Sequence, residues 1–510
     1  MLQSIIFADE ITLWWDKKEF SENVVIYKLY LNEKYHGCTK KTHYTFNDLK
    51  FDTAYTVSIK AYNTESSEEK TYVFRTKQPK KCIDVSLAPY FAVGDGKTLN
   101  TMAIQRALKD CKTDEYVYFP AGVYLTGALN IGSNTEIYLE DGAVLQGTAQ
   151  VEDYCPQIKS RFEGIERICY RSLLNMGELD SNNYGYSCEN VVIRGKGSIF
   201  GGGKVLALAM MEAEREKIRD YLANNEEYIK TCETKNTIPG RVRGRLINMS
   251  NCKGVVLCGI KMGYGPSWNI HFVYSKNIVT YGCEIYSDKV LNDKGEVCIE
   301  PVWNGDGWDP DSSQDCAIFN SVFRTYDDCI AIKSGKNPEG NIINRPTKNI
   351  YIFDCKALSG YGVSIGSEMS GGVENIYIWD CDLVNTGCGI QVKTTRKRGG
   401  YVKNIEAYNC VVSSIYVRAA TYNDDGVGAE RPPLLCNFRY ENIKIVGYTC
   451  PSGLTVYVSL NGFEDSDRYL SNVYFNNICV CANEGEPVLE KRYVNGLTWN
   501  NVKYIQDKAE

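Results

Sequence analysis

The sequence predicts an all-β chain in which a small β-sandwich precedes a long solenoid, a right-handed parallel β-helix. Three observations predict this fold. The 510 residues include 44 Gly and 37 Tyr, which favours strands and tight turns. Residues 1–76 contain short segments of alternating polarity, and a strand pattern recurs through the rest of the chain. We therefore expect a sandwich at 1–76, a linker at 77–82 and a β-helix domain at 83–510.

The first segment reads as strands at 11–15, 24–31 and 55–62, separated by polar turns. It resembles a fibronectin type III domain, and residues 49–55 resemble the tyrosine corner of that family. Such domains act as spacers or binding modules. We favour a plainer role, in which this segment is a packing partner for the next domain.

The remainder repeats one pattern. Residues 349–355 (Asn-Ile-Tyr-Ile-Phe-Asp-Cys) recur at 375–381 and more loosely at 404–410, with offsets of 26 and 29 residues. Each copy is a short strand with inward Ile or Val, an Asn at a turn and a buried Cys. One copy cannot bury its own apolar face, but stacked copies can. The repeat therefore predicts a solenoid of β-coils.

Two segments have helical spacing instead. Residues 101–111 are expected to form a helix that caps the open end of the solenoid. Residues 204–236 are expected to form a helical insert outside the coil. The insert either walls a cleft or covers apolar surface of the rungs.

Charge and cysteine content limit the possible functions. A net charge of -6 argues against nucleic-acid binding, and no run of 18 apolar residues predicts a membrane span. The first residues have neither a basic region nor a long apolar core, so we expect no signal peptide. The 21 cysteines are an odd number without disulfide or zinc spacing, which favours reduced thiols and a cytoplasmic location.

One group of acidic residues stands out from the others. Asp306 lies 21 residues before Asp327 and 22 before Asp328, close to one turn of a β-helix. Adjacent rungs are about 4.8 Å apart, so the three carboxyls should stack on one face and one should hold its proton near neutral pH. A protonated acid beside an ionised base is what glycoside hydrolysis needs. A calcium site or a stack of polar turns is the alternative.

Residues 304–313 and 326–335, which contain these carboxyls, resemble the signature motifs of glycoside hydrolase family 28, the polygalacturonase family. The resemblance covers about residues 83–505. Four further segments match pectin-degrading β-helices of this kind: 92–105, 118–127, 265–271 and 344–347.

The resemblance implies an inverting hydrolase that needs no metal or organic cofactor. Asp327 matches the general acid, Asp306 and Asp328 match the carboxylates that activate water, and Lys393 matches a substrate-binding lysine. The candidate substrate-binding residues are Trp268, His271, Trp308, Lys333, Tyr361, Glu368, Gln391 and Lys393.

Two positions depart from the family pattern. Tyr361 replaces a histidine, and a phenol does not become charged near pH 7. Gln391 replaces an arginine that helps bind a substrate carboxylate, and an amide offers neither charge nor a bidentate fork. The basic run 396–398 either contacts an acidic sugar or is a solvated loop.

We therefore expect an exo-acting glycosidase that releases a terminal sugar, galacturonate by family default, from pectin-derived oligosaccharides or plant glycosides. A neutral terminal sugar such as rhamnose or apiose is the first alternative. A β-eliminating lyase and a noncatalytic carbohydrate-binding β-helix are the others. The expected partner is an oligosaccharide or glycoside, with neither nucleic acid nor membrane, and a flat flank of the coil is available for a homo-oligomer.

Overall fold

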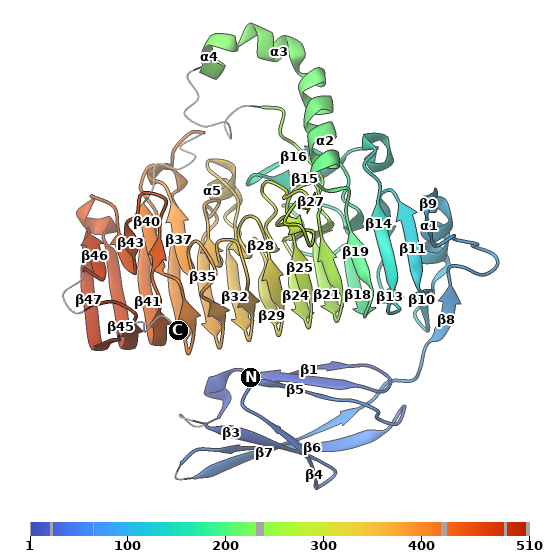
Figure 1. The fold of residues 1–510 in the computed structure, drawn as a ribbon, viewed down its shortest axis with the longest axis horizontal. Helices are drawn as coiled ribbons and strands as arrows, with labels where there is room; N and C mark the ends of the chain where they lie inside the picture. The colour runs from blue at the N-terminus through green and yellow to red at the C-terminus, as the bar shows by residue number, and fades with distance from the viewer. Residues whose placement is uncertain are drawn as a thin grey trace. The chain divides into compact units, whose positions relative to one another are not determined.

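The computed structural model describes residues 2–20, 24–64, 66–230, 239–419, 426–483 and 487–505. The chain divides into two compact units (Figure 1). Met1–Cys82 with Thr113–Tyr116 form one unit, and Ile83–Lys112 with Val117–Glu510 form the other.

The first unit consists of two antiparallel sheets. Their strands are β1 (Leu2–Ile6), β2 (Ile11–Trp15) and β5 (His43–Phe46) in one sheet, and β3 (Ile26–Leu31), β4 (Lys34–Thr39), β6 (Ala54–Tyr62) and β7 (Ser67–Arg75) in the other; η1 (Lys17–Glu19) is a 3-10 turn. Trp15 is fully buried, with its ring edge-on to that of Tyr27 at 5.1 Å. The hydroxyl of Tyr55 accepts a hydrogen bond from the Lys50 amide at 2.8 Å, as the predicted tyrosine corner requires.

The second unit is the predicted parallel β-helix. The face that carries the candidate site is an eleven-stranded parallel sheet. Its strands in order are β12 (Leu129–Ile131), β17 (Leu174–Met176), β20 (Ile247–Ser250), β23 (Ile270–Val273), β28 (Trp308–Asp311), β31 (Ile330–Ile332), β34 (Val363–Ile365), β37 (Ile390–Thr394), β40 (Ile415–Ala419), β44 (Val458–Asn461) and β46 (Leu489–Arg492).

The other faces belong to a 23-stranded sheet whose strands pair in two rows. The first row is β8 (Lys81–Asp84), β10 (Glu115–Phe119), β13 (Glu136–Leu139), β18 (Cys188–Gly195), β21 (Cys252–Cys258), β24 (Lys276–Tyr281), β29 (Gln314–Phe319), β32 (Thr347–Phe353), β35 (Val373–Trp379), β38 (Tyr401–Tyr408), β41 (Leu434–Ile445), β45 (Leu470–Val480) and β47 (Val494–Tyr504). The second is β9 (Asp95–Leu99), β11 (Gly122–Thr126), β14 (Ala143–Gly147), β19 (Ser198–Phe200), β22 (Lys261–Gly263), β25 (Glu284–Tyr286), β30 (Val322–Arg324), β33 (Lys356–Ala357), β36 (Asp382–Leu383) and β39 (Val411–Val412).

The sequence repeat corresponds to the rungs. Its three clearest copies lie on β32, β35 and β38, which pair in parallel. The Asn375 amide donates to the Asn349 side chain at 3.0 Å, and Asn404 donates to Asn375 at the same distance. These asparagines have positive φ, a conformation that asparagine tolerates at turns. The predicted Asn turn is therefore a hydrogen-bonded ladder.

Both predicted helical segments contain helices. α1 (Thr101–Asp110) buries Ile104, Ala107 and Leu108 in the core at one end of the coil (Figure 1). The insert contains α2 (Gly203–Lys217), α3 (Arg219–Asn224) and α4 (Glu226–Lys230), and its predicted residues 231–236 lie outside the described residues. Among the described residues, no helix has the length and apolar character needed to cross a membrane.

Several shorter elements extend from the coil. They are the hairpins β15 (Ile158–Phe162) with β16 (Ile165–Cys169), β26 (Val290–Leu291) with β27 (Val297–Ile299) and β42 (Tyr448–Thr449) with β43 (Thr455–Val456), the helix α5 (Glu339–Ile343), and the 3-10 turns η2 (Val151–Tyr154), η4 (Arg396–Arg398) and η5 (Ser466–Arg468).

Candidate active site

Asp306 and Asp328 each lie two residues before neighbouring strands of the eleven-stranded sheet. Trp308 begins β28, Ile330 begins β31, and the two residues are partners in the parallel register. The Gly307 amide donates to the Asp328 carbonyl oxygen at 2.9 Å. An offset of 22 residues is therefore one turn of the coil at this point, as the sequence spacing predicts.

Burial and mutual repulsion strengthen proton binding by the carboxyls of Asp306 and Asp327. Burial is the main cause that raises the pKa of Asp306 to about 8; Lys333 opposes it, while Asp327 and Asp328 add to it. Burial, followed by the charge of Asp328, also raises the pKa of Asp327. Because Asp306 and Asp327 interact, they titrate as a pair, and the pair holds at least one proton near neutral pH.

Lys333 lies among three acidic side chains. Its Nζ is 3.2 Å from Asp306 Oδ2, 3.6 Å from Glu368 Oε2 and 3.9 Å from Asp309 Oδ1. Burial pushes the pKa of Lys333 down, but the surrounding carboxylates outweigh burial and raise it well above its ordinary value. Burial raises the pKa of Asp309, whereas Lys333 and other cations outweigh burial at Glu368 and lower its pKa. The ammonium group is thus the central counter-charge of the site.

Asp328 is held at both carboxylate oxygens. Lys393 Nζ donates to Oδ2 at 2.7 Å, and Ser364 Oγ donates to Oδ1 at 2.6 Å. Gln391 Nε2 donates in turn to Ser364 Oγ at 2.7 Å, and only 4% of Gln391 is exposed. Gln391 was expected to bind substrate, but its amide is hydrogen-bonded to Ser364, the residue that holds Asp328.

The three aspartates line one pocket, which contains about 560 Å³ of empty space, including the part open to solvent. Four other predicted residues line it as well, namely Trp268, Lys333, Glu368 and Lys393. Within the described part of the chain, no group of three or more His, Cys, Asp or Glu side chains is arranged to hold a metal ion.

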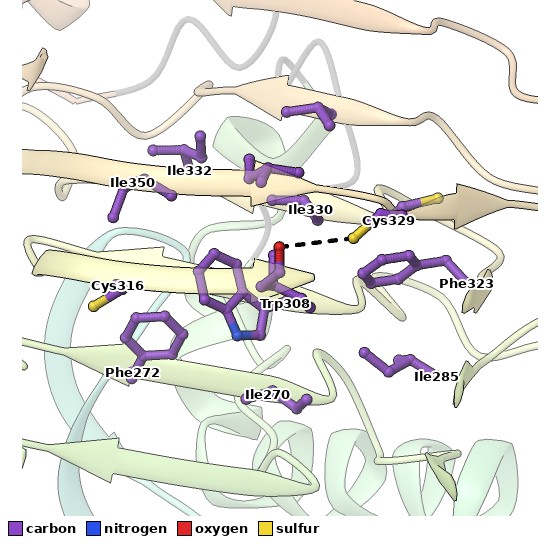
Figure 2. Packing of buried hydrophobic residues seen from close by; sticks show 14 of the residues in the cluster. Ile270, Phe272, Ile285, Trp308, Cys316, Phe323, Cys329, Ile330, Ile332 and Ile350 are labelled. Atoms are coloured by element: carbon purple, nitrogen blue, oxygen red, sulfur yellow. Dashed lines mark hydrogen bonds between the residues drawn. The ribbon is translucent and has the colours of Figure 1, made fainter. Parts of the chain in front are cut away.

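Two predicted substrate-binding residues are wrong, because both are fully buried away from the pocket. Trp308 points into the coil and lies beside Phe272 (Figure 2), with the two rings edge-on and their centroids 5.0 Å apart. Its indole nitrogen donates to Thr280 Oγ1 at 3.1 Å. Successive side chains of a strand point to opposite faces, so Trp308 faces inward. His271 Nε2 lies 3.3 Å from Asp311 Oδ2, and burial lowers the histidine pKa to about 4. His271 is therefore a neutral group beneath the site.

Tyr361, which stands in place of the family histidine, lies beside Asp327. Its backbone amide donates to the Asp327 carbonyl oxygen at 3.2 Å, and 44% of the residue is exposed. Burial of part of the ring, followed by the charge of Asp327, raises the pKa of the phenol. Tyr361 is outside the pocket lining, so among the described residues its place is at the rim.

Sequence reasoning missed six lining residues, three of which carry positive charge: Glu163, Arg241, Asn304, Lys336, Ser367 and Arg398. Arg398 is fully buried, and its guanidinium donates to the Ser367 carbonyl oxygen at 2.9 Å and to Asn337 Oδ1 at 2.6 Å. The basic run 396–398 was the one signal for this residue. Glu163 and Arg241 come from distant segments, and no spacing in the sequence connects them with the aspartates.

The hairpin β15–β16 reaches across the sheet to the site. Gly164 lies in the turn of this hairpin, and its carbonyl oxygen accepts a hydrogen bond from the Lys336 amide at 2.9 Å. Gly164 has φ +76, and a Cβ there would lie 2.8 Å from Cγ of Glu368, so glycine permits this close approach. Arg161 Nη1 also pairs with Asp311 Oδ1 at 2.7 Å. The hairpin follows β12 in the chain but is fixed on the segments that follow β28 and β31.

Comparison with known proteins agrees with this geometry. Three family models match: glycosyl hydrolases family 28 over residues 161–421, rhamnogalacturonase A/epimerase, pectate lyase-like, over 85–153, and the fibronectin type III domain over 5–76. A probable polygalacturonase of Vitis vinifera is 30% identical over 63% of this chain, a match that spans 59% of its own length.

Two other relatives match nearly the whole chain. An exo-poly-alpha-D-galacturonosidase of Dickeya chrysanthemi is 24% identical over 97% of this chain and 88% of its own. A family 28 exopolygalacturonase structure from Yersinia enterocolitica superposes with a TM-score of 0.80 at 22% identity, covering 99% of this chain and 95% of that one. Since the family 28 model covers just over half of the 510 residues, including all three aspartates of the pocket, the chain belongs to glycosyl hydrolase family 28.

Proposed function

We propose that this protein is an exo-acting polygalacturonase that releases terminal galacturonate from pectin-derived oligosaccharides by hydrolysis with inversion. One observation carries the proposal. Asp306, Asp327 and Asp328 line the same pocket as a group of cationic side chains, namely Lys333, Lys393, Arg241, Lys336 and Arg398. This combination supplies both proton transfer and charge for binding a uronate.

In the proposed reaction, Asp327 donates its proton to the glycosidic oxygen, and the leaving sugar departs as a neutral alcohol. Asp306 and Asp328 bind a water molecule, and the ionised carboxylate takes its proton as the water oxygen bonds to the anomeric carbon. Because bond formation and bond breaking occur on opposite sides, the configuration inverts. The raised pKa of Asp327 supports its assignment as the proton donor.

The hairpin β15–β16 supports action at a chain end. It contributes Glu163 to the pocket lining and is fixed by the contact of Gly164 with Lys336. A polymer that enters the pocket meets this hairpin, so only a terminal residue fits. The helical insert had two predicted roles, to wall a cleft or to cover apolar surface of the rungs. The described residues of α2, α3 and α4 contribute no side chain to the pocket of the aspartates. The hairpin is therefore the proposed barrier.

The lining cations support an acidic sugar even though Gln391 replaces the family arginine. Arg398 and Lys336 line the pocket, and both interact electrostatically with Glu368. Guanidinium groups bind carboxylates in a bidentate manner, and a lysine adds a point charge. We propose that these two residues take over carboxylate binding from position 391.

The test is product analysis with tri- and tetragalacturonate. Wild type should release monomer from the first time point, and Asp327→Asn should reduce the rate by at least about 100-fold. Asp382→Asn is the matched control, because Asp382 is a partly exposed aspartate on the coil, paired with Lys356 at 3.4 Å. Early release of dimers and trimers would disprove exo action, and unchanged activity in Asp327→Asn would disprove the acid assignment.

A neutral terminal sugar is the second candidate, favoured by the burial of Gln391 and its hydrogen bond to Ser364. Oligosaccharides capped with rhamnose or apiose, assayed beside the galacturonides, distinguish the two. Faster release of the neutral cap, with Arg398→Gln leaving its KM unchanged, would favour this candidate.

We also propose that the protein works in a reducing compartment such as the cytoplasm. Cys355, Cys381 and Cys410 are free thiols that form a row buried in the coil. Thiol titration of the unfolded protein purified without reductant should recover nearly all 21 thiols. Recovery of only a few would contradict the proposal.

A further inference from the structure

A directed hydrogen-bond chain connects Gln391 to a carboxylate of the pocket. Ser364 and Gln391 are partners in the register of β34 and β37. The chain runs from Gln391 Nε2 to Ser364 Oγ at 2.7 Å and from Ser364 Oγ to Asp328 Oδ1 at 2.6 Å. Ser364 is fully buried, and Asp328 and Gln391 are 1% and 4% exposed. The chain is therefore shielded from competing water.

The direction of each bond follows from the chemistry of its ends. An ionised carboxylate only accepts hydrogen bonds, so the one hydroxyl hydrogen of Ser364 must point to Asp328. The serine oxygen is then left as an acceptor, and the amide nitrogen of Gln391 fills that place. A donor at position 391 thus keeps the serine hydrogen on Asp328, and such chains strengthen each bond.

We propose that Gln391 is a positioning residue that holds Asp328 in its ionised, water-activating state through Ser364. The inference rests on the proposed hydrolysis, in which Asp328 helps to activate water. It gives position 391 a role other than substrate contact. Lys393 completes the arrangement, because its ammonium group fixes the other oxygen of Asp328 at 2.7 Å.

Other charged and titratable groups also act on Asp328. The carboxyls of Asp306, Asp309 and Asp327 and the ammonium groups of Lys333 and Lys393 interact with it electrostatically. Among the described residues, the titratable groups Cys329, Tyr361 and Cys388 also sense the charge of Asp328. Burial raises the pKa of each of these three, so they are neutral in the working pH range.

A positioning role and a substrate-binding role predict different kinetics. A residue that binds substrate alters mainly KM when removed. A residue that keeps a base ionised alters kcat and the acidic limb of the kcat/KM profile, because a carboxylate that loses a hydrogen bond binds its proton more tightly. The test therefore measures kcat, KM and the pH profile together.

The variants are Gln391→Ala, Ser364→Ala, the double variant and Gln391→Glu, assayed on tetragalacturonate. We expect both single alanine variants to lower kcat about tenfold, to leave KM within about twofold, and to move the acidic limb upward by about one pH unit. The double variant should lower kcat no more than Ser364→Ala does, because both changes break the same hydrogen-bond chain. Gln391→Glu should lower kcat about 100-fold, because a carboxylate at position 391 competes with Asp328 for the hydroxyl hydrogen of Ser364.

Ser459→Ala is the matched control. Ser459 lies on the same sheet, is 4% exposed and donates to Glu490 at 2.9 Å, two strands beyond Gln391. It should leave kcat, KM and the pH profile unchanged. A KM effect of Gln391→Ala with normal kcat and pH profile would overturn the inference, and so would losses that add in the double variant.

A second measurement does not depend on turnover. The melting temperatures of Ser364→Ala and Gln391→Ala should lie further below that of wild type at pH 7 than at pH 4, because the lost hydrogen bonds favour an ionised carboxylate. A pH-independent difference would overturn the inference. If wild type hydrolyses no galacturonide while this pH dependence is present, the proposed function fails and the hydrogen-bond role of Gln391 stands.

Discussion

Two faces of the same coil differ in what neighbouring rungs place side by side. On the row β29–β32–β35–β38, aromatic rings stack on one another: the centroids of Phe319 and Phe353 are 4.7 Å apart, those of Phe353 and Trp379 are 4.3 Å apart, and those of Trp379 and Tyr408 are 5.7 Å apart. The rings are nearly parallel and uncharged. In this row, packing of the rings adds to the sheet and asparagine hydrogen bonds that join the rungs.

The eleven-stranded sheet places unlike groups side by side. Asp306 precedes Asp328 by one turn, and Lys333 is the counter-ion of three acids around it. Repulsion and burial raise the pKa of Asp306 and of Asp309 there. Regular stacking of like side chains therefore stabilises the coil. The site places unlike, charged side chains on neighbouring rungs, and its contribution to stability depends on pH. The variants below separate these two contributions.

Lys333→Met should give the largest effect, a loss of about 3–5 kcal/mol in the free energy of unfolding at pH 7, because it leaves buried acids without their shared cation. The loss should shrink at pH 4, where the acids gain protons. Urea unfolding at both pH values measures it. Equal losses at the two pH values would mean that packing of the lysine stem, and not charge, is what matters.

Trp379→Ala should cost about 3–5 kcal/mol as well, through the cavity left in the aromatic row. Here the loss should be the same at pH 4 and pH 7, because the stacked rings carry no charge. Trp379→Phe serves as the control and should cost less than about 1.5 kcal/mol. The folded fraction of Trp379→Ala should keep its kcat, and a lower kcat would contradict the separation of the two faces.

Asp306→Asn should change the pH dependence of the free energy of unfolding, with a difference from wild type of a few kcal/mol at most. The pKa of Asp306 is about 8 in the folded chain against 3.8 for an exposed aspartate. The folded chain therefore binds more protons between these values, and stability falls as pH rises through them. Asparagine removes this contribution, so the decline in melting temperature from pH 4 to pH 8 should flatten. A decline as steep as that of wild type would refute the assignment.

Asn375→Ala should have the smallest effect, about 1–2 kcal/mol. It removes two ladder hydrogen bonds of 3.0 Å and places alanine at φ +59. The loss should be independent of pH, with activity unchanged. Asn375→Gly separates the two causes, because glycine relieves the backbone but not the lost bonds. A larger loss in glycine than in alanine would show that backbone conformation is not the cause.

Most of the scaffold was predictable because its determinants are local and periodic. The Asn and Ile positions of the repeat mark the rungs, and these positions are in register in the structure. The offset of 22 residues likewise predicts that Asp306 and Asp328 stack, and both line the pocket.

The errors come from the direction of side chains and from insertions. Trp308 and His271 lie inside the signature segments, but one faces the core and the other is buried beside Asp311. Gln391 matches a substrate-binding position, but in the structure it donates to Ser364. Neither a motif nor a spacing records which neighbour a side chain meets.

The sequence by itself determined the coil, the sandwich before it and the three aspartates, because repeats and one-turn spacings are properties of neighbouring rungs. Only the tertiary structure decided what surrounds those aspartates. Glu163 comes from the hairpin β15–β16 and Arg398 from η4, and they meet at one pocket because a compact coil brings together residues that are far apart in the chain. The charge balance of the site depends on such long-range contacts, which a linear pattern does not contain.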